Sequence, residues 1–99
     1  MGKIKLSNHT DLPSVRFRGV HFDPAYQFSR DVAAGAIATV DNVPSGSIGL
    51  TAYRASDQVS LDMLSYPVSD ETGFAAVLIH DPEDEFQPYK LVGEPFQIP

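Results

Sequence analysis

The chain has 99 residues, 42% of them hydrophobic and none of them cysteine, so it can form one modest core but neither disulfides nor thiolate metal sites. Its formal net charge of −6 argues against a nucleic-acid-binding module, because phosphate binding needs a basic face. No apolar run approaches the roughly 20 residues that span a bilayer, and residues 1–9 lack the apolar segment of a secretory signal, so synthesis without export is expected.

Short alternating segments mark the start of the chain. Residues 3–6 alternate lysine with isoleucine or leucine, which is typical of either an edge strand or a mobile chain end. Residues 15–22 alternate as well, so the sequence predicts a strand there that carries Arg16 and Arg18 on the same face.

Residues 25–34 are the one candidate for a helix, because a short alanine run precedes Gly35. The segment is too short to be stable unless it is packed, so one helical turn or a loop is predicted. Together with the alternating pieces before it, this makes residues 1–35 an extended N-terminal arm outside the main domain.

From residue 36 the pattern becomes that of β-strands separated by turns. The predicted strands, rich in β-branched or alternating apolar residues, are 36–41, 48–53, 59–64 and 74–79. The last of these is apolar on both parities, as in a central strand covered on both faces. Prolines confine residues 86–99 to an extended edge segment. The sequence thus predicts an all-β fold in which residues 36–99 form a small antiparallel β-sandwich, with a core that includes Leu50, Leu61, Leu78 and Ile79.

The run Ser69-Asp-Glu-Thr-Gly has the composition of a turn. Asp70 can accept hydrogen bonds from the backbone amides that follow it, and Gly73 can adopt the left-handed φ that closes a hairpin. Asp70, Thr72 and Gly73 are therefore predicted to be structural turn residues, with a positive φ at Gly73.

No catalytic, cofactor or metal site is predicted. The three histidines are far apart in sequence and form no metal-binding motif, and no nucleophile elbow or phosphate loop occurs. The acidic loop, residues 81–85, has enough carboxylates to bind calcium but lacks the spacing of a calcium loop. A solvated loop is favoured, and calcium binding stays open.

Three segments carry a resemblance to a known family: Ile48-Gly-Leu-Thr-Ala-Tyr-Arg, Tyr66-Pro-Val-Ser-Asp-Glu-Thr-Gly-Phe and Ala76-Val-Leu-Ile-His-Asp. Residues 36–99 resemble the carboxypeptidase-regulatory, or transthyretin-like, β-sandwich domain. The acidic loop and the closing Pro95-Phe-Gln-Ile-Pro are similar to versions of this domain in tailed-phage virion proteins.

The resemblance implies a transthyretin-like or Ig-like sandwich with a non-enzymatic structural or assembly role in a phage tail, baseplate or neck. Its partners would be other virion proteins in a symmetric assembly, with no cofactor, nucleic acid, membrane or small-molecule substrate. The expected location is the virion, after synthesis in the host bacterial cytoplasm. Related hydrolases end in Tyr-Arg-Gly-Ser, which Phe-Gln-Ile-Pro does not match, so no enzyme is expected. The alternative function is a stand-alone module that binds a peptide or a glycan.

The predicted arm combines basic and apolar side chains, a combination that favours a partner surface. It is expected to add a strand to a sheet edge, of its own chain or of a neighbouring subunit, and the neighbour is favoured. Its basic side chains would then face acidic loops such as residues 81–85. The partner-contact candidates are Lys3, Lys5, Arg16, Phe17, Arg18, Phe22 and Tyr26.

Overall fold

The computed structural model describes residues 2–22 and 25–98, which form eight β-strands and no helix. No helix long and apolar enough to cross a membrane occurs in these ranges. The all-β prediction is therefore confirmed. In chain order the strands are β1 (Gly2–His9), β2 (Ser14–Phe22), β3 (Ala25–Ala33), β4 (Ile37–Val43), β5 (Gly46–Arg54), β6 (Val59–Val68), β7 (Thr72–His80) and β8 (Tyr89–Gln97).

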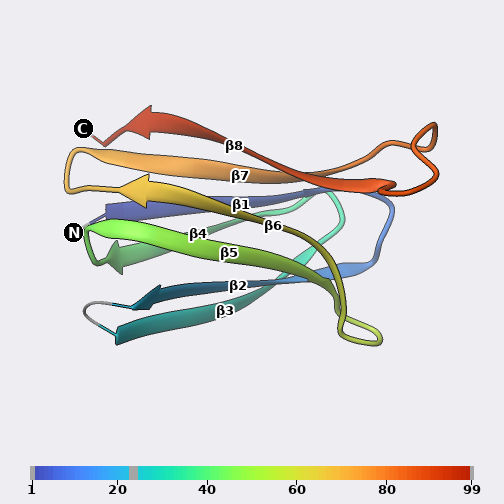
Figure 1. The fold of residues 1–99 in the computed structure, drawn as a ribbon, viewed down its shortest axis with the longest axis horizontal. Coiled ribbons are helices and arrows are strands. Elements are labelled where there is room, and N and C mark those ends of the chain that lie inside the picture. The colour runs from blue at the N-terminus through green and yellow to red at the C-terminus, as the bar shows by residue number, and fades with distance from the viewer. Residues whose placement is uncertain (1, 23–24, 99) are drawn as a thin grey trace.

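The strands form two sheets of four. Sheet A has the order β4-β1-β7-β8 and sheet B the order β3-β2-β5-β6. All strands run along the long axis of the molecule, and both ends of the chain lie at the same end of it (Figure 1). The chain crosses from one sheet to the other four times, and only β2–β3, β5–β6 and β7–β8 are consecutive strands paired within one sheet.

The core lies between the sheets because alternate side chains of each strand point inward. Leu50 and Leu78 are fully buried, as predicted, whereas Leu61 is half-buried and Ile79 lies half-buried on the outer face of sheet A. Burying one such leucine contributes about 1.5–3 kcal/mol relative to leaving it in water. The largest fully buried side chains are Phe17, Phe74, Ile4, Leu6, Ile48, Leu50 and Leu78.

The predicted N-terminal arm is wrong. β1 is an inner strand of sheet A, antiparallel to β4 and parallel to β7, where Ile4 lies opposite Phe74. β2 is an inner strand of sheet B, between β3 and β5. Because the β1–β7 pair is parallel, the sandwich is not purely antiparallel either. Residues 2–33 thus supply three strands, and without them β7 would have an unpaired edge.

The segment predicted as one helical turn or a loop, residues 25–34, is mostly strand β3. It pairs with β2 residue by residue, from Ser14 opposite Ala33 to Phe22 opposite Ala25. Backbone pairing in a long hairpin outweighs the helical preference of three alanines, which is small per residue.

The later strands follow the prediction more closely. β5, β6 and β7 cover the predicted segments, and β8 is an edge strand that contains Pro95. β7 is central, as predicted, but its side chains alternate between buried and half-buried, so only one of its faces is fully covered.

A buried asparagine fixes the crossover from β1 to β2. Asn8 is fully buried, and its Nδ2 donates to the carbonyl oxygens of Leu12 and Val32, both at 3.1 Å. Its Oδ1 accepts from the amide of Thr10 at 3.1 Å and from the Thr10 hydroxyl at 2.6 Å. This side chain therefore ties β1 to the following loop and to β3, and it makes the end of β1 an ordered part of the core.

Candidate functional surface

The seven predicted partner-contact residues do not form one surface. Lys3 and Lys5 lie on the outer face of sheet A, where Lys3 pairs with Asp41 at 3.5 Å and Lys5 lies 4.7 Å from the centre of the Phe96 ring. Arg16, Arg18 and Phe22 lie on the outer face of sheet B.

Phe17 and Tyr26 do not belong to either outer face. Phe17 is fully buried in the core, so its assignment as a partner contact is wrong, because the alternation that turns Arg16 and Arg18 outward turns Phe17 inward. Tyr26 is half-buried against the core, with its ring 6.2 Å from that of Phe28.

On the outer face of sheet B, Arg16 is held by Asp31 on the neighbouring β3. Its Nε lies 2.8 Å from Oδ1 and its second terminal nitrogen 3.2 Å from Oδ2, a two-point contact, and Gln58 accepts a further bond at 3.2 Å. The hydrogen bonds to Arg16 lower the pKa of the Asp31 carboxyl, and those to Asp31 raise the pKa of Arg16. The charge of Arg16 is thus largely balanced within the fold.

Arg18 is different. Its guanidinium donates to the side-chain oxygen of Gln27 at 3.2 Å, and within the described residues it pairs with no carboxylate. Arg18 borders a groove of about 440 Å³, the basic groove, which is lined mainly by Arg16, Arg18, Gln27, Tyr53 and Gln58. The groove therefore presents a positive charge to anything that enters it.

A second groove follows on the same face. Gly49 occupies the outward position between Val20 on β2 and Ser65 on β6, and it has no side chain to fill the space above the sheet. A hollow of about 430 Å³ results, the Gly49 hollow, whose outer-face lining is Val20, Phe22, Gly49, Thr51, Met63 and Ser65. Phe22 is 85% exposed and Met63 70% exposed, so the rim is apolar and open to solvent.

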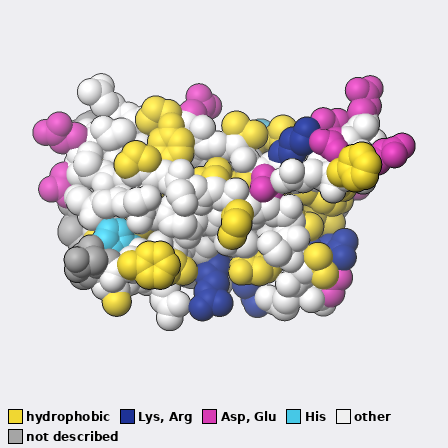
Figure 2. Space-filling view, in the orientation of Figure 1, with side chains coloured by type: hydrophobic (Ala, Val, Ile, Leu, Met, Phe, Trp, Pro, Cys, Tyr) yellow, Lys and Arg dark blue, Asp and Glu magenta, His cyan; other side chains and the backbone are white. Residues whose placement is uncertain are grey.

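The two grooves adjoin. Arg18 lies directly opposite Thr51, which lies opposite Met63, so one row of residues across the sheet contains the arginine and two side chains of the hollow. Figure 2 shows basic and apolar side chains next to one another over the β2–β3 side of the molecule. The outer face of sheet B thus places a positive charge beside an apolar hollow.

The acidic loop, residues 81–85, lies at the end of the molecule opposite the two chain termini (Figure 1). Lys90 of β8 pairs with Asp81 at 3.2 Å and with Asp84 at 3.0 Å. Backbone amide bonds, led by that of Gln87, and the bond from Lys90 lower the pKa of the Asp84 carboxyl. Two of the four carboxylates are therefore used inside the loop.

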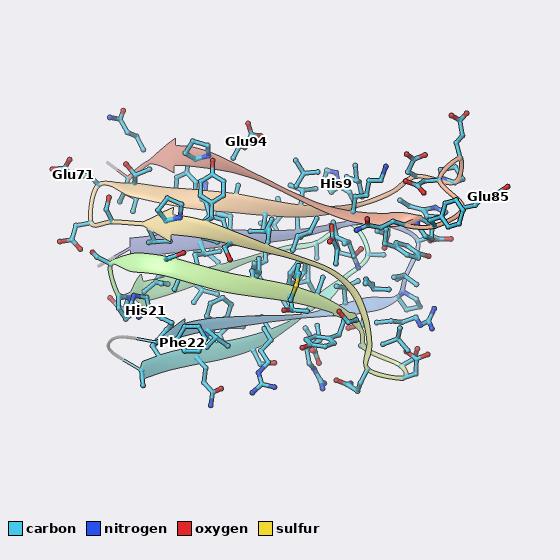
Figure 3. All side chains as sticks on the ribbon, in the orientation of Figure 1. His9, His21, Phe22, Glu71, Glu85 and Glu94 are labelled. Atoms are coloured by element: carbon cyan, nitrogen blue, oxygen red, sulfur yellow. The ribbon has the colours of Figure 1, made fainter. Side chains whose placement is uncertain are left out.

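Glu83 and Glu85, the other two, are exposed, and Phe86 follows with 98% of its surface exposed. Figure 2 shows acidic side chains gathered at this end, and Figure 3 shows Glu85 pointing outward there. No three side chains of His, Asp or Glu among the described residues are grouped so that they could hold a metal ion.

The turn from β6 to β7 differs from its prediction. It carries the chain from sheet B to sheet A, so it does not close a hairpin. Ser69 Oγ accepts hydrogen bonds from the backbone amides of Glu71, at 3.3 Å, and Thr72, at 3.0 Å. Asp70 is exposed. The predicted positive φ at Gly73 is wrong. Glycine is required there because a Cβ would overlap the carbonyl oxygen of Lys3 on β1.

The histidines stay apart. His9 is exposed, and His80 stacks on the Tyr89 ring at 4.8 Å between ring centres. His21 is buried, and its Nε2 donates to the carbonyl oxygen of Ser45 at 2.8 Å.

Sequence reasoning missed Gly49, Met63 and Phe86 as surface features. A glycine within an alternating strand is a usable signal, since it often marks a close approach or an unfilled position.

Comparisons of the chain with protein-family models, with curated proteins and with solved structures gave no match.

Proposed function

We propose that the protein is a non-enzymatic structural or assembly component of a tailed-bacteriophage particle, in the tail, baseplate or neck, and that it acts through contacts with other virion proteins. In this proposal the fold is a transthyretin-like or Ig-like sandwich, as the resemblance of residues 36–99 implies. The protein is made in the bacterial host and becomes part of the virion.

The observation that supports this proposal best is the large apolar side chains left in water. Phe22, Met63 and Phe86 are each at least 70% exposed, and Ile37 is 66% exposed. Single exposed apolar residues are common, but Phe22 and Met63 border one hollow on a sheet face, which is the form that protein-contact surfaces take. The rigid framework of paired strands holds this surface in a fixed shape.

The test uses gradient-purified particles of the phage that encodes the chain. Mass spectrometry should find the protein in particles at a copy number that matches a symmetric structure, and an antibody with a gold label should locate it on the tail, baseplate or neck. A protein that is abundant in infected cells but missing from purified particles would refute the proposal. In that case peptide-library and glycan-array binding would test the alternative, a stand-alone binding module.

A further inference from the structure

The outer face of sheet B and the end of the acidic loop have complementary chemistry. The face offers the guanidinium of Arg18, which pairs with no carboxylate among residues 2–22 and 25–98, beside the apolar Gly49 hollow. The loop offers an exposed carboxylate, Glu85, followed directly by an almost fully exposed phenyl ring, Phe86. Each surface places a charged side chain beside an apolar group, and the two charges are opposite.

The two surfaces cannot meet within one molecule. Glu85 and Phe22, which borders the hollow, lie at opposite ends in Figure 3, and the longest extent of the molecule is 37 Å. The partner of each surface must therefore come from another molecule.

We propose that the acidic loop of one copy docks on the outer face of sheet B of a second copy. Phe86 enters the Gly49 hollow, and Glu85 pairs with Arg18 at its border. The contact is head-to-tail, so it leaves a free loop on one copy and a free hollow on the other, and it extends into a ring or a filament. This proposal deepens the assembly role proposed above and rests on it, since a repeating contact is what an array requires.

The small area of this contact predicts a weak interface. A buried phenylalanine covers about 150–250 Å², well below the roughly 800 Å² per partner of a stable interface. The Glu85–Arg18 pair lies at a rim, where charge complementarity mainly sets orientation and association rate. We therefore expect self-association between micromolar and millimolar protein, with further contacts added when the chain is held in a particle.

Gly49→Val tests directly whether the Gly49 hollow is the docking site. A Cβ at this position meets only the carbonyl oxygen of Val20, at 3.9 Å, so the fold leaves room for a side chain here, and we expect valine to occupy part of the hollow. The change also favours the strand, because β-branched residues suit it better than glycine. Thr39→Val is the matched control, since it adds the same side chain to an exposed position on the outer face of sheet A.

The experiment is an NMR dilution series of the isotope-labelled full chain, with sedimentation velocity on the same samples. With rising concentration, the wild type and Thr39→Val should shift the amide signals of Arg18, Thr51 and Phe86 and sediment faster. Gly49→Val and Phe86→Ser should keep their thermal stability and lose both effects. A wild type without concentration-dependent shifts up to millimolar protein, or a Gly49→Val that associates like the wild type, overturns the proposal.

Charge reversal tests the direction of the contact. Arg18→Glu and Glu85→Lys should each associate at least tenfold more weakly than the wild type, and an equimolar mixture should recover the association, because each loop then meets a groove of opposite charge. A mixture no stronger than either variant alone would also overturn the proposal. The particle experiment is independent: a chain that associates in this way but is missing from particles refutes only the role in the virion.

Discussion

Truncating Asn8 tests whether the β1–β2 crossover is a rigid part of the core. Asn8→Ala removes four hydrogen bonds, two donated to Leu12 and Val32 and two accepted from Thr10. At a net value of about 1 kcal/mol each, the loss is about 3–4 kcal/mol. A domain of this size has about 5–15 kcal/mol in total, so the variant should fold with a much lower urea midpoint.

The assay is urea unfolding followed by circular dichroism, with Thr10→Val as the control. That control removes both bonds of the Thr10 hydroxyl, the one donated to Asn8 and the one accepted from the Leu12 amide, and keeps the bond from the Thr10 amide to Asn8. At about 1 kcal/mol for each bond it should lose about 2 kcal/mol. An Asn8→Ala protein within about 0.5 kcal/mol of the wild type would refute the reasoning, because four satisfied bonds at a fully buried site cannot then be contributing.

Three more perturbations probe other parts of the fold. Gly73→Ala and Gly73→Asn should both strongly lower the melting temperature, because any Cβ there meets the Lys3 carbonyl oxygen. A small effect of Gly73→Asn on the melting temperature would instead indicate a left-handed φ at this position. Leu78→Ala should cost about 2–5 kcal/mol in urea unfolding through the cavity it leaves, and an unchanged midpoint would exclude a buried Leu78. Asp31→Asn should lower the urea midpoint at pH 7, and its difference from the wild type should shrink in acid, because the pKa of Asp31 is depressed in the folded state and its contribution is lost as the pH falls through that folded pKa. A variant weakened equally at pH 7 and in acid would show that the Arg16 pair is not the cause.

The strands could be predicted from the sequence because their alternation is local. Residues 15–22, 48–53 and 59–64 repeat every second residue, and all three became strands. The order of strands in the sheets could not be predicted, because pairing joins residues far apart in the chain, as Ile4 and Phe74 show. Residues 3–6 alternate in the same way whether their strand is inner or at an edge, so the pattern was compatible with an arm.

The candidate surface could be predicted in part. Alternation correctly placed Arg16 and Arg18 on one face, and the same rule applied to Phe17 would have removed it from the partner contacts. The exposure of Phe86 could not be predicted, because aromatic residues at strand spacing are more often part of a core. Only the loop conformation between β7 and β8 leaves it in water.

The edge strands of both sheets carry features that oppose backbone pairing with another molecule. We therefore expect contacts between copies to use a sheet face rather than the addition of a strand to a sheet edge. β6 and β8 contain Pro67 and Pro95, and proline is a residue by which edge strands avoid pairing. In β3, Arg30 occupies an inward-facing position opposite Phe17, and a charge so placed penalises a flat intermolecular pairing. β4 is the shortest strand and is interrupted by Asn42 at φ 59°. All four edges thus carry a feature that opposes pairing, whereas the outer face of sheet B carries an open hollow beside an arginine. A contact made there leaves the backbone pairing of both molecules intact.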